Sequence, residues 1–152
     1  IDNGYETIDW TLPTGFKVIQ RYSSGDLIQA RTMLYGKAIL KINILNDKPN
    51  RKKHKNGIAP NFIHSLDACH LTLTTNSLYD KGVKNISMVH DEYCCHAKNM
   101  DLMNETLREN FVYMYNKKPL EDFINRYDFI DFYVEEGNFD LNNIYKSKYF
   151  FC

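Results

Sequence analysis

Apolar and polar positions alternate in the first third of the chain, as they do in half-buried strands. Over residues 5–11, Ile8 and Trp10 lie on one side of an extended chain and polar residues on the other; a Pro-Thr-Gly turn precedes residues 16–19. Alternation on both sides of such a turn predicts a β-hairpin. A second extended region is predicted over residues 30–45, where apolar residues are available to either face.

The pattern then changes to the three- and four-residue spacing of amphipathic helices. Residues 47–55 are polar and basic and predict a short helix or a loop. Pro60 favours the first position of a helix, so a helix is expected from Pro60 to about Tyr79, closed by Asp80-Lys81-Gly82. Its apolar stripe comprises Phe62, Leu66, Cys69, Leu73 and Leu78. Further helices are predicted over Asn99–Tyr115, from Pro119 through Tyr127, and over Leu141–Lys146.

Between the two longest predicted helices lies a strand–turn–strand pattern. Apolar runs at residues 86–89 and 93–97 flank His90-Asp91-Glu92, which places Asp91 at the tip of a turn. The order of elements predicts an α+β fold of β-hairpins packed with amphipathic helices. A carboxylate held in this way suits a hard divalent cation. Turn chemistry alone also explains Asp91, because aspartate often occupies turns.

Composition and charge add a division along the chain. The 152 residues are 43% hydrophobic and 14% aromatic, which suits one packed domain or a piece of a larger protein. Residues 1–56 carry ten Lys and Arg against five Asp and Glu, a net charge of +5, and residues 57–152 carry −5. The split suggests that one end faces a polyanion and the other faces metals or solvent, although scattered surface charge explains it equally well. No stretch approaches the length of a membrane span.

The cysteines predict reduced thiols rather than disulfides or zinc. Cys94 and Cys95 are neighbours whose side chains point to opposite faces of a strand. Cys69 and Cys152 lie far from them, and no CxxC pair occurs. We therefore expect an intracellular compartment. A zinc site built from these cysteines and nearby histidines is disfavoured because the regular spacing of structural zinc ligands is absent.

Four separated segments carry a resemblance to a known family. They are Trp10-Thr11-Leu12-Pro13-Thr14-Gly15-Phe16 with Val18-Ile19-Gln20, the stretch Asn56 to Leu71 that contains Ala59-Pro60-Asn61-Phe62-Ile63-His64-Ser65, His90-Asp91 with His96-Ala97, and the aromatic end Ser147 to Cys152. In this order they resemble the carboxy-terminal part of single-subunit, phage-type DNA-directed RNA polymerases, the family that includes the mitochondrial enzymes. The resemblance covers nearly the whole chain.

The resemblance implies an architecture and a set of site residues. Residues 1–64 would be the end of the fingers and residues 65–152 the carboxy-terminal palm of a right-hand polymerase. Asp91 would be one of two aspartates that bind two Mg²⁺ ions for template-directed nucleotidyl transfer. His64 would sense the ribose 2′-hydroxyl of the incoming nucleotide. The terminal residues would form a foot near the active centre: Tyr149, Phe150, Phe151 and Cys152.

The resemblance also implies partners and a location. They are a DNA template, an RNA product, ribonucleoside triphosphates and the rest of the polymerase in the same or another chain, with no membrane. The location would be mitochondrial, or the host cell of a phage or plasmid. A basic cluster could grip template or product phosphates, with a solvated loop as an equal alternative: Arg51, Lys52, Lys53 and Lys55.

Glu92 departs from the family pattern, which has a serine or another small or polar residue after the aspartate. His-Asp-Glu instead resembles family A DNA polymerases, so a fragment of such an enzyme is one alternative, and a non-catalytic nucleic-acid-binding module is another. The second aspartate and the lysine and tyrosine that handle the triphosphate and base match nothing before Gly57. The chain is therefore expected to begin after those motifs and to be inactive alone.

Overall fold

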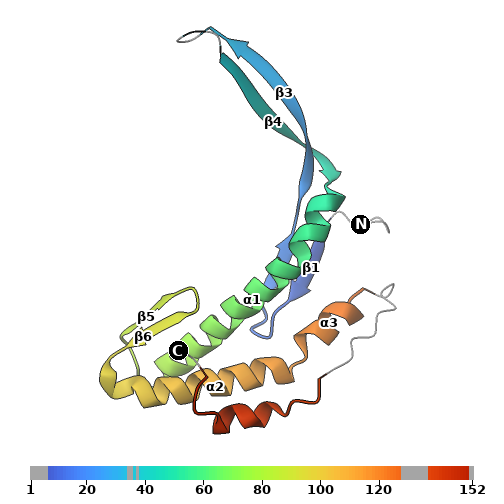
Figure 1. Cartoon of the computed structure of the whole chain (residues 1–152). Coiled ribbons are helices and arrows are strands. Elements are labelled where there is room, and N and C mark those ends of the chain that lie inside the picture. The colour runs from blue at the N-terminus through green and yellow to red at the C-terminus, as the bar shows by residue number, and fades with distance from the viewer. Residues whose placement is uncertain (1–6, 34–35, 37, 128–136, 151–152) are drawn as a thin grey trace. The chain divides into compact units, whose positions relative to one another are not determined.

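The computed structural model describes residues 7–33, 36, 38–127 and 137–150, and combines antiparallel hairpins with helices, as the sequence predicts (Figure 1). Three separate two-stranded sheets are formed by β1 with β2, β3 with β4, and β5 with β6. The strands are β1 (Ile8–Thr11), β2 (Lys17–Gln20), β3 (Ser23–Thr32), β4 (Ala38–Pro49), β5 (Ile86–Val89) and β6 (Glu92–Cys95). The helices are α1 (Arg51–Asp80), η1 (Ala97–Asn99), α2 (Met100–Asn116), α3 (Pro119–Asn125) and η2 (Leu141–Lys146), where η denotes a 3₁₀ helix. None of the helices in the described ranges has an apolar stretch long enough to cross a bilayer.

The chain divides into two compact units, each described here by itself. The first unit comprises residues 1–9 and 19–61, and the second comprises residues 10–18 and 62–152. Helix α1 contributes residues to both.

The first hairpin is confirmed. The Leu12 amide donates to the Phe16 carbonyl over 2.9 Å, and the Gly15 amide donates to the Leu12 carbonyl over 2.7 Å. Gly15 has a φ of 84°, a left-handed conformation that glycine adopts without steric cost. The Pro-Thr-Gly turn therefore closes the hairpin as predicted.

The second extended region is confirmed but is larger than predicted. It is a ribbon of β3 and β4 in antiparallel register, in which Ile28 faces Ile42 and Ala30 faces Leu40. Strand β4 continues to Pro49, so the predicted loop or short helix over residues 47–55 is wrong. Its first three residues complete β4 and its last five open α1.

The predicted start of the long helix at Pro60 is also wrong, because α1 begins at Arg51 and contains Pro60. The side chain of Asn50 accepts a hydrogen bond from the Lys53 amide over 3.0 Å, which is the bond of an N-cap residue. This cap satisfies one of the free backbone amides in the first turn of α1, which begins nine residues before Pro60. Pro60 lacks an amide hydrogen, so it cannot donate the helical hydrogen bond to the Asn56 carbonyl. The helix nevertheless continues on both sides of Pro60. The predicted end is confirmed, since Gly82 adopts a φ of 91° just after Asp80.

Polar side chains join α1 to the strands of the first unit. His54, only 1% exposed, accepts the Tyr22 amide at Nε2 over 3.2 Å. Gln20 is also buried, and its Nε2 donates to the His54 carbonyl over 3.2 Å. Asn61 Nδ2 donates to Gln20 Oε1 over 2.8 Å and to the Tyr22 hydroxyl over 3.0 Å. These bonds fix the first three turns of α1 against the end of β2 and against Tyr22, which precedes β3.

The second unit has a core of aliphatic and aromatic side chains. Trp10 is 2% exposed, and its ring lies 5.8 Å from the rings of both Phe62 and Phe123. The Trp10 indole nitrogen donates to the Ser65 hydroxyl over 2.9 Å, which satisfies its buried polar atom. A second cluster of buried residues joins α1, α2 and the segment between them: Leu78, Val83, Met103 and Leu107.

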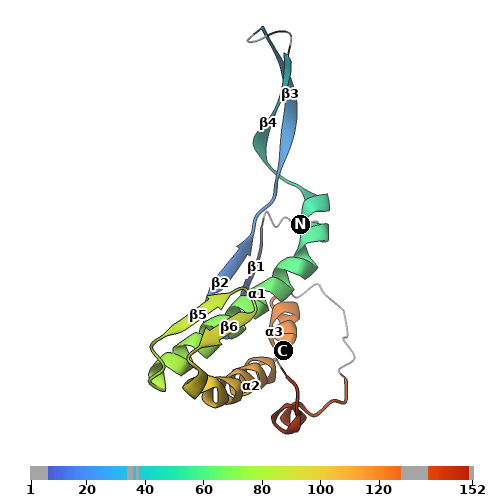
Figure 2. The ribbon, with the colours of Figure 1, turned by 60° about the vertical axis from the view of Figure 1, so that its left-hand side comes forward.

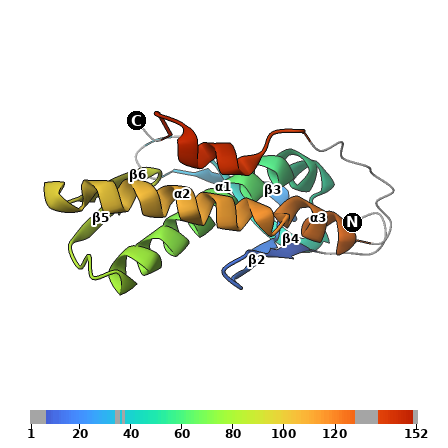
Figure 3. The ribbon, with the colours of Figure 1, turned by 90° about the horizontal axis from the view of Figure 1, so that it is seen from below.

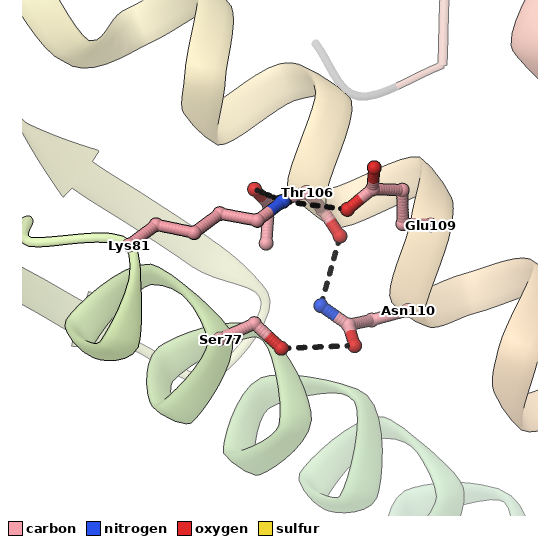
Figure 4. A network of polar contacts seen from close by, with 5 residues as sticks. All are labelled: Ser77, Lys81, Thr106, Glu109 and Asn110. Carbon is pink, nitrogen blue, oxygen red and sulfur yellow. Dashed lines mark hydrogen bonds and ion pairs between the residues drawn. The ribbon is translucent and has the colours of Figure 1, made fainter.

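Helix α2 lies between the second half of α1 and η2 (Figures 1 and 3). Polar contacts join α1 and the turn that follows it to α2 (Figure 4). Lys81 Nζ donates to Thr106 Oγ1 over 3.0 Å and to the Glu109 carboxylate over 2.6 Å. Ser77 Oγ donates to Asn110 Oδ1 over 3.2 Å. The predicted helices Asn99–Tyr115, Pro119–Tyr127 and Leu141–Lys146 are all confirmed to within a few residues.

Candidate active site at the β5–β6 turn

The predicted strand–turn–strand is confirmed, and Asp91 lies in its two-residue turn. Val89 faces Glu92 at the last ladder position, so only His90 and Asp91 connect β5 to β6. His90 has a φ of 57°, the left-handed conformation that two-residue hairpin turns require. The hairpin lies beside the second half of α1 (Figure 2). The four paired positions of the hairpin therefore place Asp91 at its tip.

Asp91 is exposed and opens onto a groove of about 780 Å³. Within the described residues, the Asp91 carboxylate makes no hydrogen bond or ion pair with the protein. Polar and apolar side chains both line the groove, from the turn, from α2 and from the tail: Asp91, Glu92, Tyr93, Cys94, Met100, Asp101, Met103, Asn104, Leu107 and Phe150. The carboxylate oxygens are thus available to a ligand.

One histidine holds the hairpin in place behind the turn. His70 of α1 is 5% exposed, and its Nε2 donates to the Leu107 carbonyl of α2 over 2.9 Å. The Tyr93 hydroxyl of β6 donates to His70 Nδ1 over 3.4 Å, and the two rings meet edge to face. Burial lowers the pKa of His70, against the Leu107 carbonyl and Asp67, which raise it. Burial raises the pKa of Tyr93 to about 12, so its hydroxyl stays protonated and donates.

The oxygen donors of the groove suit a hard cation but do not complete a site. Asp91, Glu92 and Asp101 line the same groove, and carboxylate oxygens are the ligands that Mg²⁺ prefers. Across the described ranges, no group of three or more His, Cys, Asp or Glu side chains is close enough to hold a metal ion. Asp91 fits as one ligand, and further ligands must come from elsewhere. Cys69, Cys94 and Cys95 are free thiols.

The tail reaches the same groove through Phe150, which lies in its wall. Tyr149, the preceding residue, is 73% exposed. The other two residues predicted for the foot, Phe151 and Cys152, lie outside the described residues.

The remaining predicted site residues lie on α1 and do not line this groove. His64 is exposed in the second unit, where its neighbour Ser65 bonds Trp10. The basic cluster belongs to the first unit, and all four of its side chains are exposed on the first turns of α1: Arg51, Lys52, Lys53 and Lys55. These four side chains are therefore both helical and open to solvent.

Three residues around the groove were missed by sequence reasoning. Tyr93 and His70 gave no signal of pairing, because they are 23 positions apart. Arg108 gave one weak signal, a cation adjacent to the apolar stripe of α2 at Leu107. It is buried and contacts the tail.

Comparisons with known proteins agree with the resemblance found in the sequence. The model of a family described as DNA-dependent RNA polymerase matches residues 2–133. The human mitochondrial DNA-directed RNA polymerase is 33% identical over 167 residues, which cover 95% of this chain and 13% of the human protein. DNA-directed RNA polymerase 1A of Nicotiana tabacum is 35% identical over 150 residues, covering 95% of this chain and 94% of that sequence.

A plastid relative matches equally well. The chloroplastic DNA-directed RNA polymerase 3 of Nicotiana sylvestris is 35% identical over 152 residues, which cover 96% of this chain and 15% of the relative. The chain thus spans only about an eighth to a seventh of the length of the human and Nicotiana sylvestris relatives. The matches decide against the alternative of a family A DNA polymerase that Glu92 suggested. The chain belongs to the phage-type DNA-dependent RNA polymerase family.

Proposed function

We propose that this chain is the carboxy-terminal fingers and palm segment of a DNA-directed RNA polymerase, and that Asp91 is a metal ligand of its active centre. Residues 1–64 complete the fingers, and residues 65–152 complete the palm and foot. The observation that carries the proposal is the position of Asp91. It lies at the tip of a two-residue turn and faces a groove, and within the described residues its oxygens have no protein partner.

The reaction is attack of the RNA 3′-hydroxyl on the α-phosphate of a ribonucleoside triphosphate, with loss of pyrophosphate. Two Mg²⁺ ions, when bound, supply activation of the attacking oxygen and stabilisation of the leaving phosphate. Asp91 contributes one carboxylate to them, and the second aspartate belongs to another part of the polymerase. The short turn limits the freedom of Asp91, so little ordering is needed when the ligands assemble.

The exposed side chains of α1 take part in binding. His64 hydrogen-bonds the ribose 2′-hydroxyl through a ring nitrogen and so favours ribonucleotides. Arg51, Lys52, Lys53 and Lys55 contact phosphates of the DNA template or the RNA product, which is supported by their exposure on one short helical segment. The location is mitochondrial, supported by the relatives from human and tobacco mitochondria.

Substitution of Asp91 in the complete polymerase tests the proposal. Asp91→Asn keeps the shape of the side chain but removes the charge that binds Mg²⁺. We expect elongation to fall by at least about a hundredfold. Binding of the template, measured by fluorescence anisotropy, stays within about twofold because the variant leaves the phosphate contacts intact.

A matched control separates the metal role from a general charge effect in the groove. Asp101→Asn removes a carboxylate that lines the same groove on α2, and we expect it to retain most of the elongation rate. Normal elongation by Asp91→Asn, with template binding intact, would instead support a non-catalytic nucleic-acid-binding module.

A second substitution tests the role of His64 in recognising the ribose. In the same elongation assay, His64→Ala should weaken the preference for ribonucleotides over deoxyribonucleotides, and an unchanged preference refutes the contact of His64 with the 2′-hydroxyl.

A further inference from the structure

A single buried arginine joins the carboxy-terminal tail to α2. Arg108 is 7% exposed, and its Nη1 donates to the carbonyl oxygens of Ile144 and Ser147, the latter over 2.7 Å. Its Nε donates to Asn104 Oδ1, one turn earlier on α2, over 2.8 Å. One guanidinium therefore binds the last turn of η2 and the residue that follows it, and its own helix orients it.

The charge of Arg108 makes this contact specific. Across the described residues, Arg108 forms no ion pair with a carboxylate, and its charge faces carbonyl oxygens at the carboxy-terminal end of η2. That end of a helix carries partial negative charge. Burying a guanidinium is unfavourable unless its donors are satisfied. If the tail moved away, Arg108 Nη1 would lose both of its carbonyl acceptors, so the tail and the arginine are held together.

The bonds from Arg108 to the Ile144 and Ser147 carbonyls, called here the tether, determine where Phe150 lies. Ser147, which Arg108 binds, is three residues before Phe150 and is further fixed by a bond from its hydroxyl to the Tyr149 carbonyl. The Phe150 ring lies 5.2 Å from the Arg108 guanidinium carbon and meets Phe111 edge to face at 5.2 Å. Phe150 then forms part of the wall of the Asp91 groove, which Arg108 itself does not line.

We propose that Arg108 is a positioning residue, which holds the tail on α2 so that Phe150 closes one wall of the Asp91 groove. The inference rests on the proposed function in one respect: the groove matters for elongation only if Asp91 is a metal ligand. The contact of Arg108 with the tail does not depend on that function. Arg108 acts on the groove only through the tail. It therefore differs from a residue that contacts the nucleotide or the metal ions.

Limited proteolysis of the complete polymerase measures the tether directly. Lys146 and Lys148 flank Ser147 and are exposed, but trypsin must pull the chain away from α2 to bind it. Arg108→Gln should increase cleavage after these lysines about tenfold or more, because hydrogen bonds from a charged donor are lost. Arg108→Lys, which keeps the charge and can reach one carbonyl, should give an intermediate rate.

Lys81→Gln is the matched control. It also removes a cation that bonds α2, at Thr106 and Glu109, but from the α1 side and away from the tail. Cleavage after Lys146 and Lys148 should stay at the wild-type rate in this variant. Wild-type cleavage in Arg108→Gln overturns the proposal. If Arg108→Gln does not fold, Arg108→Lys decides: faster cleavage supports the tether and an unchanged rate overturns it.

A double substitution tests whether Arg108 acts through Phe150. Arg108→Gln and Phe150→Ala should each slow elongation, and the double variant should be no slower than the slower single variant, since both disrupt the same wall. If the two substitutions slow elongation independently, so that their effects multiply, the inference is overturned.

Failure of this inference is distinguishable from failure of the proposed function. Faster tail cleavage in Arg108→Gln together with normal elongation by Asp91→Asn retains the tether and rejects the metal role.

Discussion

At the scale of single residues, His70 links three elements behind the candidate site. Its two ring nitrogens have different roles, because Nε2 donates to the Leu107 carbonyl on α2 and Nδ1 accepts the Tyr93 hydroxyl on β6. Only a neutral imidazole can play both roles. Burial, which lowers the pKa of His70, favours that neutral form, and Asp67 opposes it. Protonation of His70 therefore costs the hairpin one of its attachments to α1.

The lowered pKa predicts how stability depends on pH. An unfolded histidine has a pKa of about 6.5, and folded His70 has a lower one, so the folded chain binds fewer protons. His70 thus stabilises the fold above about pH 6.5, and this contribution is lost as the pH falls through the folded pKa. Between pH 7.5 and 5.5 we expect the free energy of unfolding to fall.

His70→Gln isolates this effect, because glutamine can still donate to Leu107 and accept from Tyr93 but does not titrate. Its free energy of unfolding, measured by urea denaturation, should change less between pH 7.5 and 5.5 than that of the wild type. Burial also lowers the pKa of His54, which remains in both proteins and so gives the variant a residual slope. Identical pH profiles would show that His70 does not titrate differently on folding.

At the scale of elements, a close contact with Tyr22 explains why α1 has a glycine at position 57. Gly57 lies inside the helix, where glycine is unfavourable relative to alanine by about 1 kcal/mol. A Cβ atom at this position would lie 2.9 Å from Tyr22 Cε2 and 3.0 Å from its hydroxyl oxygen. The Tyr22 ring cannot yield easily, because Asn61 bonds its hydroxyl and the ring packs edge to face on His54.

We therefore predict that Gly57→Ala destabilises the chain despite the higher helix propensity of alanine. Overpacking costs about 1–3 kcal/mol, which exceeds the gain in propensity of about 1 kcal/mol. Asn56→Ala, at the adjacent exposed position, has no such contact and should be neutral or slightly stabilising. Thermal denaturation followed by circular dichroism measures both variants. A rise in Tm for Gly57→Ala would mean that Tyr22 adjusts at little cost.

At the scale of the whole molecule, the β3–β4 ribbon has two different faces. Facing pairs in the register share one face, so Ile28, Ala30, Leu40, Ile42 and Ile44 lie together on one face, called here the apolar face. Its polar members, Asp26 and Thr32, lie at its two ends. The other face is mixed, because Leu27, Ile39 and Leu45 lie on it with four polar residues: Gln29, Arg31, Lys41 and Asn43. Ile28, Leu40, Ile42 and Ile44 are each about half exposed or more. Two-stranded ribbons are marginally stable in water, and exposed apolar faces of strands promote association.

This face predicts that the isolated chain associates with itself as its concentration rises. Ile42→Lys places a charge in the middle of the apolar face, and it should shift sedimentation velocity profiles toward the monomer. Asn43→Lys adds the same charge at the next position, on the opposite, mixed face, and should leave association unchanged. Equal effects of the two variants would attribute association to net charge rather than to the apolar face.

The sequence by itself determined the features that depend on neighbouring residues. The first hairpin, the turn that carries Asp91, the end of α1 at Gly82 and the three later helices all follow from local periodicity and turn chemistry. The family resemblance also came from short segments in order, and the comparisons confirmed it.

Only the tertiary structure decided the features that depend on distant residues. It moved the start of α1 from Pro60 to Arg51, because the buried contacts of His54 with Gln20 and Tyr22 hold the first turns. It also brought Phe150 to the Asp91 groove through Arg108, whose partners lie 36 and 39 positions away. Contacts between distant segments leave no periodic pattern in the sequence. The free energy that stabilises them comes from burial of one segment against another, and not from the order of residues within a single segment.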